Sequence, residues 1–381
     1  MLNVLGVIAA VAAVAVPLHA QKVCAPIGQW TVPGGARIES NEVLMRAARG
    51  SVVLLGESHD NADHHRWQLQ TVGALAALHP KVVLGFEMFP RRVQGALDRW
   101  VAGELSEEEF LRASDWSRVW GMETEHYLPL FHFARINRIP MLALNVERNF
   151  VQTVRARGIE AVPPEKREGV TAAAPASEAY VDWLYRIFSE HFEKGRIVGR
   201  GDPEFRRFVA AELIWDSAMG QAIAQSVARD TETLVVGIMG SGHIRFGHGV
   251  PHQLESLGVT RIASLLPWSA GTDCGDFTQG MATAVFGLPA EQPARSRPLL
   301  GVTLETATEG VRVVTVAPGS IAEAAGLRAG DVIVEAAGKA LKAFGEVRSV
   351  VQRVLSGTWL PLKVRRGDEI VELVAKFPPA K

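Results

Sequence analysis

Four apolar stretches of the sequence each end in side chains that can carry a charge or bind a ligand. A carboxylate at the end of a buried stretch needs a partner, because burying an unpaired charge is costly. Carboxylates and imidazoles bind divalent metals, move protons in acid–base catalysis and ligate haem iron. The stretches 51–55, 81–86, 139–144 and 233–239 are followed, respectively, by Glu57 and His59, by Glu87, by Asn145 and by His243.

One interpretation of these residues is a divalent metal site. Carboxylate oxygens and imidazole nitrogens suit such ions, and a metal-activated water would hydrolyse a substrate, with Glu57 and Glu87 as the catalytic residues. A serine hydrolase is disfavoured, since the Gly-Ser-Gly at 240–242 lacks the Gly-x-Ser-x-Gly pattern. The metal ligands would be Glu57, His59, Glu87 and His243.

The other interpretation is haem, held without covalent attachment because the chain has no Cys-x-x-Cys-His sequence. An imidazole would ligate the iron, apolar side chains would hold the porphyrin, and an arginine would meet a propionate. His64 and His65 are adjacent on a predicted helix and point apart, so one at most faces the ligand and the other is expected in solvent. The candidate cofactor-binding residues are His59, His64, Asn145, Arg148 and His243.

Short apolar runs alternate with segments of helical periodicity between residues 51 and 266. Runs that are apolar throughout are typical of parallel strands buried on both faces, with the intervening helices as the cover. The sequence therefore predicts an α/β domain, centred on a parallel sheet with helices on both faces. In such a sheet ligands bind outside the carboxyl ends of the strands, so the candidate residues are expected to meet at that edge.

The composition excludes several classes of protein. The chain of 381 residues is 48% apolar, and its 40 Lys and Arg nearly balance its 41 Asp and Glu. This balance argues against a nucleic-acid partner, which would select a basic surface. No internal apolar run reaches 18 residues, which excludes a polytopic membrane protein.

Residues 1–20 are predicted to be a secretory signal peptide. The segment from Val4 to Val16 is almost unbroken Val, Ala, Leu and Ile, and cleavage is expected after Ala20. An uncleaved N-terminal anchor is the alternative, because no Lys or Arg precedes the apolar run. Either reading predicts an exported protein of the periplasm or cell envelope, in contact with a membrane only if the segment is retained.

Cys24 and Cys274 are the only two cysteines. In an oxidising compartment they form the one possible intramolecular disulfide, which would close a loop of about 250 residues. Two unpaired thiols are the alternative. Cys24 also lacks the small preceding residue that lipid attachment needs, which disfavours a lipoprotein.

A linker is predicted at 289–298, where three prolines interrupt any hydrophobic periodicity. It separates a large domain at 21–288 from a tail at 299–381. The tail alternates period-two strands with short helices and is expected to be a small α+β module.

Several short sequences of the large domain, taken together, resemble the ChaN-type haem-binding uptake family over about residues 40–285. They are Gly56-Glu57-Ser58-His59-Asp60, His64-His65, Gly85-Phe86-Glu87-Met88-Phe89, Leu144-Asn145, Trp215-Asp216 and Gly240-Ser241-Gly242-His243.

The resemblance implies haem binding at the cell surface or in the periplasm for iron acquisition. If the family ligates iron through tyrosine, it makes Tyr127 a further candidate. The wider group includes the Tiki and TraB proteins and the erythromycin esterases, in which such Glu and His residues are thought to serve hydrolysis. The resemblance therefore implies both interpretations.

The run from Pro318 to Ile333 resembles a PDZ domain of the bacterial protease-associated kind, which takes an extended peptide or a protein C-terminus as an added strand. In the peptide groove that this implies, Leu300 and Gly301 would bind the carboxylate. The remaining predicted peptide-binding residues are Val302, Leu304, Val347, Val350 and Val354, of which the three helical valines equally fit a core role.

We therefore expect an exported haem-binding protein of haem or iron uptake, with non-covalent haem as its cofactor and a peptide-binding PDZ domain. A metal-dependent hydrolase is the first alternative, and a protein that serves only as an interaction module is the second.

Overall fold

The computed structural model describes residues 23–190, 199–291, 299–352 and 354–379. The predicted signal peptide at 1–20 and most of the predicted linker lie outside the described residues. The chain divides into two compact units after Glu291. Within the described ranges, no helix is both long enough and apolar enough to cross a membrane.

The first unit is built on an eight-stranded sheet in the order β2-β1-β8-β7-β3-β6-β4-β5. From β8 to β5 every neighbouring pair of strands is parallel, while β1 is antiparallel to both β8 and β2. The strands are β1 Trp30–Thr31, β2 Arg37–Ile38, β3 Val52–Glu57, β4 Val82–Pro90, β5 Met141–Asn145, β6 Leu234–Gly240, β7 Ile262–Ser269 and β8 Ala284–Leu288.

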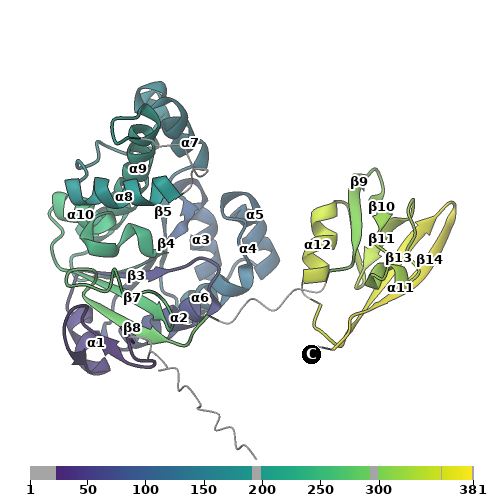
Figure 1. Ribbon diagram of the computed structural model, residues 1–381, viewed down its shortest axis with the longest axis horizontal. Coiled ribbons are helices and arrows are strands. Elements are labelled where there is room, and N and C mark those ends of the chain that lie inside the picture. The colour runs from purple at the N-terminus through teal and green to yellow at the C-terminus, as the bar shows by residue number, and fades with distance from the viewer. Residues whose placement is uncertain (1–22, 191–198, 292–298, 353, 380–381) are drawn as a thin grey trace, which may run out of the picture. The chain divides into compact units, whose positions relative to one another are not determined.

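Helices cover both faces of this sheet, as the sequence predicts (Figure 1). Successive residues of a strand point to opposite faces. Val53 and Leu55 accordingly pack with α2, α3 and α6, whereas Val52 and Leu54 pack with α9 and α10. Each such fully buried side chain contributes roughly 1.5–3 kcal/mol. The helices are α1 Ser40–Ala48, α2 Ala62–Leu78, α3 Gln94–Ala102, α4 Glu107–Ala113, α5 Trp116–Val119, α6 Thr124–Ile136, α7 Arg148–Arg157, α8 Glu178–Glu190, α9 Pro203–Arg229 and α10 Val250–Ser256.

A disulfide joins Cys24 to Cys274, with the two Cα atoms 5.7 Å apart. The pairing is the one that the sequence allows, and it fixes the segment before β1 to the loop that follows β7. In the chain-entropy model, closing a loop of this length stabilises the fold by about 5 kcal/mol.

The second unit is an antiparallel β domain with two helices. Its main sheet has the order β14-β13-β11-β10-β9, and β12 pairs with β11. The strand β9 is therefore an edge strand in the described part of the chain. The elements are β9 Val302–Ala307, β10 Gly310–Val316, α11 Ile321–Ala324, β11 Val332–Ala336, β12 Lys339–Ala340, α12 Phe344–Gln352, β13 Trp359–Arg366 and β14 Glu369–Lys376.

Candidate functional site

Two buried glutamates flank one glycine at the carboxyl edge of the parallel sheet. Strand β6 lies between β3 and β4, so its last residue, Gly240, lies beside Glu57 on one side and near Glu87 on the other. The Gly240 amide donates to Oε2 of Glu87 at 2.6 Å. A Cβ atom at Gly240 would lie 3.1 Å from Cε1 of His59 and 3.7 Å from Oε2 of Glu87. The absence of a side chain here therefore lets groups from three strands converge.

The first group, which we call the Glu57 cluster, consists of Glu57, His59, His65 and Tyr127. Oε1 of Glu57 accepts a hydrogen bond from the Tyr127 hydroxyl at 3.0 Å and lies 2.8 Å from Nδ1 of His59. Nδ1 of His65 lies 3.5 Å from Oε2 of Glu57. Because a carboxylate only accepts, Nδ1 of His59 is the donor in its bond. The Glu57 carboxylate thereby fixes the orientation of the His59 ring.

His59 is the member of this cluster that reaches the surface. Its side chain is 35% exposed, while that of Glu57 is fully buried. Nε2 has no hydrogen-bond partner among the described residues, and the Trp120 ring lies edge-on at 4.7 Å between centroids. Burial acts to lower the pKa of His59, but the hydrogen bond to Glu57 and the charge of Glu87 outweigh it, so this pKa is raised. The cluster thus presents one oriented imidazole nitrogen.

Helix α2 places the two adjacent histidines. Asn61 caps its first turn by accepting from the amides of Asp63 and His64. His65 then lies against Glu57, while Nδ1 of His64 accepts from the Ser58 amide at 2.8 Å and its Nε2 lies 3.2 Å from Oγ of Ser269. The prediction that one of the two histidines is solvated is wrong, because both imidazoles are buried. His65 packs against Glu57, and His64 against Ser58 and Ser269.

The second group, the His243 cluster, consists of Glu87, Tyr180, Asp216 and His243. Nδ1 of His243 lies 2.7 Å from Oδ1 of Asp216, and its Nε2 lies 3.5 Å from Oε1 of Glu87. The Tyr180 hydroxyl donates to Oδ2 of Asp216 at 2.7 Å. Both ring nitrogens of His243 are therefore engaged by carboxylates.

The His243 cluster is stabilised by the interaction of its imidazole with the two neighbouring carboxylates. Burial alone would raise the pKa of Glu87, but the charge of His243 and its hydrogen bond, helped by His59 and the Gly240 amide, lower it to about 2. Burial likewise acts to lower the pKa of His243, yet Glu87 and Asp216 together raise it well above its ordinary value. The cluster is an imidazolium held between two carboxylates.

Comparison with known proteins gives a family for this arrangement. Residues 43–254, more than half of the chain, match the family described as haem-binding uptake, Tiki superfamily, ChaN. The chain belongs to this family. Residues 298–376 match the PDZ domain family.

Parts of the chain are also similar to solved structures. A Campylobacter jejuni ChaN, described as showing cofacial haem binding, is 16% identical over 71% of this chain and 98% of its own, with a TM-score of 0.50. The HtrA3 PDZ domain bound to a phage-derived ligand is 27% identical and covers 20% of this chain and 82% of its own, with a TM-score of 0.19. A serine endoprotease from Yersinia pestis is 26% identical over 22% of this chain and 30% of its own, with a TM-score of 0.20. No curated protein matches the chain.

For a ChaN family member, the exposed edge of the sheet fits haem better than a metal ion. Nowhere in the ranges that the structure describes are three or more His, Cys, Asp and Glu side chains arranged to hold a metal. His243 has no free nitrogen, whereas Nε2 of His59 is unpartnered and has Trp120 beside it. The metal-dependent hydrolase is therefore not supported.

The other predicted cofactor-binding residues lie around this edge in different roles. Asn145 is buried and donates from Nδ2 to the carbonyl oxygen of Glu87 at 3.0 Å, so it fixes the backbone there. Arg148 is exposed at the start of α7. Tyr127 is fully buried, its hydroxyl is bonded to Glu57, and burial raises its pKa beyond the ordinary range of a phenol. Its hydroxyl supports the carboxylate and faces away from solvent.

Three members of the two clusters are absent from the predicted site. In the sequence, Asp216 is marked only by the family resemblance of Trp215-Asp216, and His65 only as the neighbour of His64. Tyr180 lies on α8, far from any strand end, and nothing in the sequence marks it. Helices α2, α8 and α9 supply these residues, so the strand-end pattern could not reveal them.

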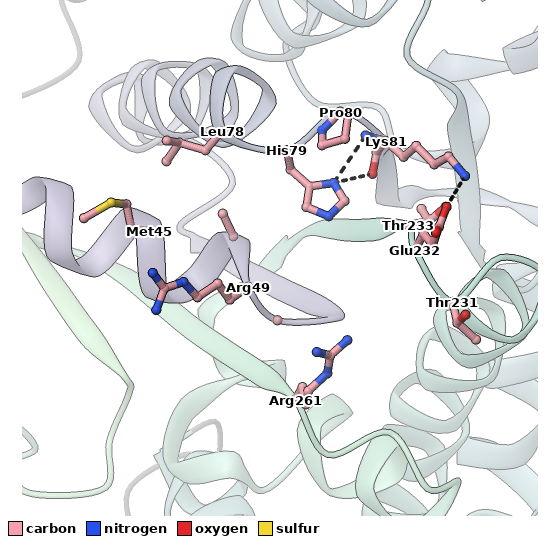
Figure 2. A pocket seen from close by; sticks show the side chains of 12 residues that line it. Met45, Arg49, Leu78, His79, Pro80, Lys81, Thr231, Glu232, Thr233 and Arg261 are labelled. Atoms are coloured by element: carbon pink, nitrogen blue, oxygen red, sulfur yellow. Dashed lines mark hydrogen bonds and ion pairs between the residues drawn. The ribbon is translucent and has the colours of Figure 1, made fainter.

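A hollow of about 770 Å³ opens at the opposite, amino edge of the sheet (Figure 2). Two of its charged groups are paired with each other, since the Lys81 ammonium lies 2.7 Å from Glu232, and it also lies 3.1 Å from Asp230. Arg261 donates to Oγ of Ser51 at 3.0 Å. None of the predicted site residues lines this hollow, so it is not the candidate site.

In the second unit, the predicted peptide-binding residues lie along β9, in the loop before it and on α12, except that Val354 lies beyond the helix, which ends at Gln352. Val302, Leu304, Val350 and Val354 are half-buried, whereas Leu300 and Val347 are buried in the core of the unit. Gly301 has a φ of +80°, and a Cβ atom there would collide with Ser320. The loop before β9 therefore requires glycine at this position.

Proposed function

We propose that the first unit binds haem non-covalently, with Nε2 of His59 as a ligand of the iron. The observation that carries this proposal is the geometry of His59, which is oriented through Nδ1 by a buried carboxylate and free at Nε2. A ligating histidine commonly donates its other N–H to a carboxylate, which fixes the ring and raises its basicity. His59 would hold the haem through this nitrogen, and the bound haem would supply a redox-active iron centre.

Membership of the haem-binding uptake family supports the same proposal, and so do two tryptophan rings near the site. Trp120 lies beside His59, and Trp183 lies within 3.4 Å of a Cβ placed on Gly242. Both tryptophans are half-buried, so their rings are partly available to a flat apolar ligand. We infer from this that the protein serves haem or iron uptake or handling.

A haemin titration followed by absorption tests the proposal. The wild-type chain is expected to give a saturable Soret shift, and His59→Ala to lose at least 100-fold in affinity. The matched control is His132→Ala, which removes a 42% exposed imidazole from a surface pair with Glu107 and should change nothing. A Soret shift that survives in His59→Ala would overturn the assignment of the ligand, and no shift in the wild type would overturn haem binding.

We infer that the protein is exported. The apolar segment at 1–20 supports this, and so does the disulfide, since disulfides persist in oxidising compartments. N-terminal sequencing of protein recovered from a periplasmic fraction tests it, because export with cleavage gives a chain beginning at Gln21. Recovery only from the cytoplasm contradicts the inference.

For the second unit we infer binding of a peptide C-terminus along β9. In the described part of the chain β9 pairs only with β10, so its outer edge is open to an added strand, and half-buried Val302, Leu304 and Val350 flank that edge. A labelled Phe-Gly-Arg-Trp-Val peptide should bind the full chain at least tenfold more tightly as the free acid than as the C-terminal amide. Equal affinity of the two forms would contradict recognition of the carboxylate.

A further inference from the structure

Arg245 is a half-buried cation beside the candidate site, and no ion-pair partner for it is found among the residues that the structure describes. It follows His243 by two residues, in the 3-10 turn Arg245–Gly247. Its guanidinium lies over the Trp268 ring, 5.7 Å from the centroid, and its Nε is buried without a hydrogen-bond partner. The acid whose charge it feels, Asp276, is not within ion-pair distance and instead lies 3.5 Å from Arg186.

The backbone holds Arg245 in this position. The next residue, Phe246, has a φ of +58°, a conformation that bulky residues rarely adopt, and its amide donates to the Met281 carbonyl at 2.9 Å. Met281 belongs to the loop that the Cys24–Cys274 disulfide fixes. Residues kept in such conformations by their surroundings are found preferentially at ligand sites.

A short chain of contacts connects Arg245 to the His59 loop. Trp268, beneath the guanidinium, is followed by Ser269, whose Oγ lies 3.2 Å from Nε2 of His64. His64 in turn accepts from the amide of Ser58, the residue before His59. Arg245 and the His59 loop therefore both lie at the carboxyl end of β7, at the edge of the sheet where the candidate site lies.

Other arginines near this edge are already engaged. Arg91 donates to the carbonyl oxygens of Glu168 and Ala218, and Arg92 pairs with Asp115 and Glu147. Arg148 is exposed. Arg245 alone of these four combines partial burial, an aromatic floor and no acceptor, and a guanidinium so placed suits a carboxylate that can accept two parallel N–H bonds.

We propose that Arg245 binds a carboxylate of the ligand that His59 ligates, which for haem is a propionate. This inference rests on the proposed function, since it names the group that orients the same ligand. It predicts that the first unit distinguishes a porphyrin with free propionates from one whose propionates are esterified.

The test compares haemin with haemin dimethyl ester on the full chain. Wild type should bind haemin at least tenfold more tightly than the ester. Arg245→Gln should lower the affinity for haemin by about 10- to 100-fold, leave the affinity for the ester unchanged and keep the Soret position, because the iron ligand is retained. If Arg245→Gln does not fold, Arg245→Lys keeps the charge but not the planar fork, and it should lower haemin affinity several-fold.

Arg135→Gln is the matched control. Arg135 is another half-buried arginine over a tryptophan, 4.4 Å from the Trp100 ring, but its guanidinium already donates to the carbonyls of Leu105 and Gly103. It should leave both affinities unchanged.

The outcomes separate the two proposals. If wild type binds haemin and its ester equally and the Arg245 variants alter neither, the role of Arg245 is overturned while haem binding stands. If wild type binds neither porphyrin, haem binding fails and the role of Arg245 fails with it. Equal losses for haemin and ester in a folded Arg245 variant would also overturn carboxylate recognition.

Discussion

The Glu57 and His243 clusters contain the same types of residue but differ in how they hold their histidine. Each contains a buried glutamate from a strand of the sheet, an imidazole and a tyrosine hydroxyl that donates to a carboxylate. In the Glu57 cluster one acid holds one nitrogen of His59, and the ring emerges into solvent. In the His243 cluster two acids hold both nitrogens of His243. The first is built to present a ligand atom, and the second to hold a charge in place.

This difference follows from the alternation of side chains along the strands. Glu57 continues the series of Val53 and Leu55, toward α2 and α6, whereas Glu87 points opposite to Phe86, toward α9. The two acids thus serve opposite faces of the sheet although they flank the same Gly240. The comparison yields four predictions.

The largest effect should come from Asp216→Asn. The carboxylate is fully buried, and its loss leaves the His243 charge poorly compensated, so the free energy of unfolding should fall by about 3–5 kcal/mol. Urea unfolding measures this. Glu104→Gln, in an exposed pair with Arg99, is the control and should change stability by less than about 0.5 kcal/mol. A stable Asp216→Asn protein that no longer binds haemin would place the ligand in the His243 cluster instead.

The second effect is a pH dependence of stability that comes from His64, the neighbour of the Glu57 cluster. Burial and the charge of His65 lower the pKa of His64 to about 4, below its unfolded value near 6.5. The unfolded chain therefore takes up the proton first, and stability present above pH 6.5 is lost as the pH falls toward 4. Between pH 7 and 4.5 the loss from this residue should be about 2–3 kcal/mol. His243 has a raised pKa, so its contribution is lost only as the pH rises through that pKa.

Urea unfolding of wild type and His64→Gln at several pH values tests the second prediction. The stability difference between the two proteins should change by the stated amount between pH 7 and 4.5. A difference that stays constant over this range would show that His64 is not the buried neutral group.

The third effect sharpens the role of Glu57. Glu57→Gln keeps a side chain that can accept from His59 but removes the negative charge, so haemin affinity should fall about 10- to 100-fold while a Soret shift remains. The control is Glu107→Gln beside His132, which should have no effect. Complete loss of the shift would instead indicate that Glu57 itself contacts the ligand.

The smallest effect is expected from Tyr127→Phe. Removal of the hydroxyl breaks its bond to Glu57 and should lower the free energy of unfolding by about 1 kcal/mol, with haemin affinity changed less than threefold. Urea unfolding and the haemin titration are the measurements. Abolished haemin binding would make Tyr127 the iron ligand, as the family resemblance allowed.

The sequence predicts the sheet, its covered faces and the strand-end residues, because apolar runs and the polar residues after them are local signals. It does not reveal β1 or β2, which are only two residues long, nor the antiparallel edge that they form. The sequence also gives no sign that Glu57 and Glu87 belong to two different clusters. Their separation depends on which helix packs on which face, and partners such as Tyr180 and Asp216 come from helices more than 90 residues away from Glu87.

The position of β6 has a consequence for how the protein is made. This strand lies between β3 and β4, yet it is synthesised after both of them and after β5. Until residue 243 has left the ribosome, the position between β3 and β4 is not yet filled by β6. Glu57 and Glu87 then lack their neighbours Gly240 and His243. The pairing of β6 with β3 and β4 is therefore a late, long-range step, and the unfinished unit is exposed to chaperones during translation.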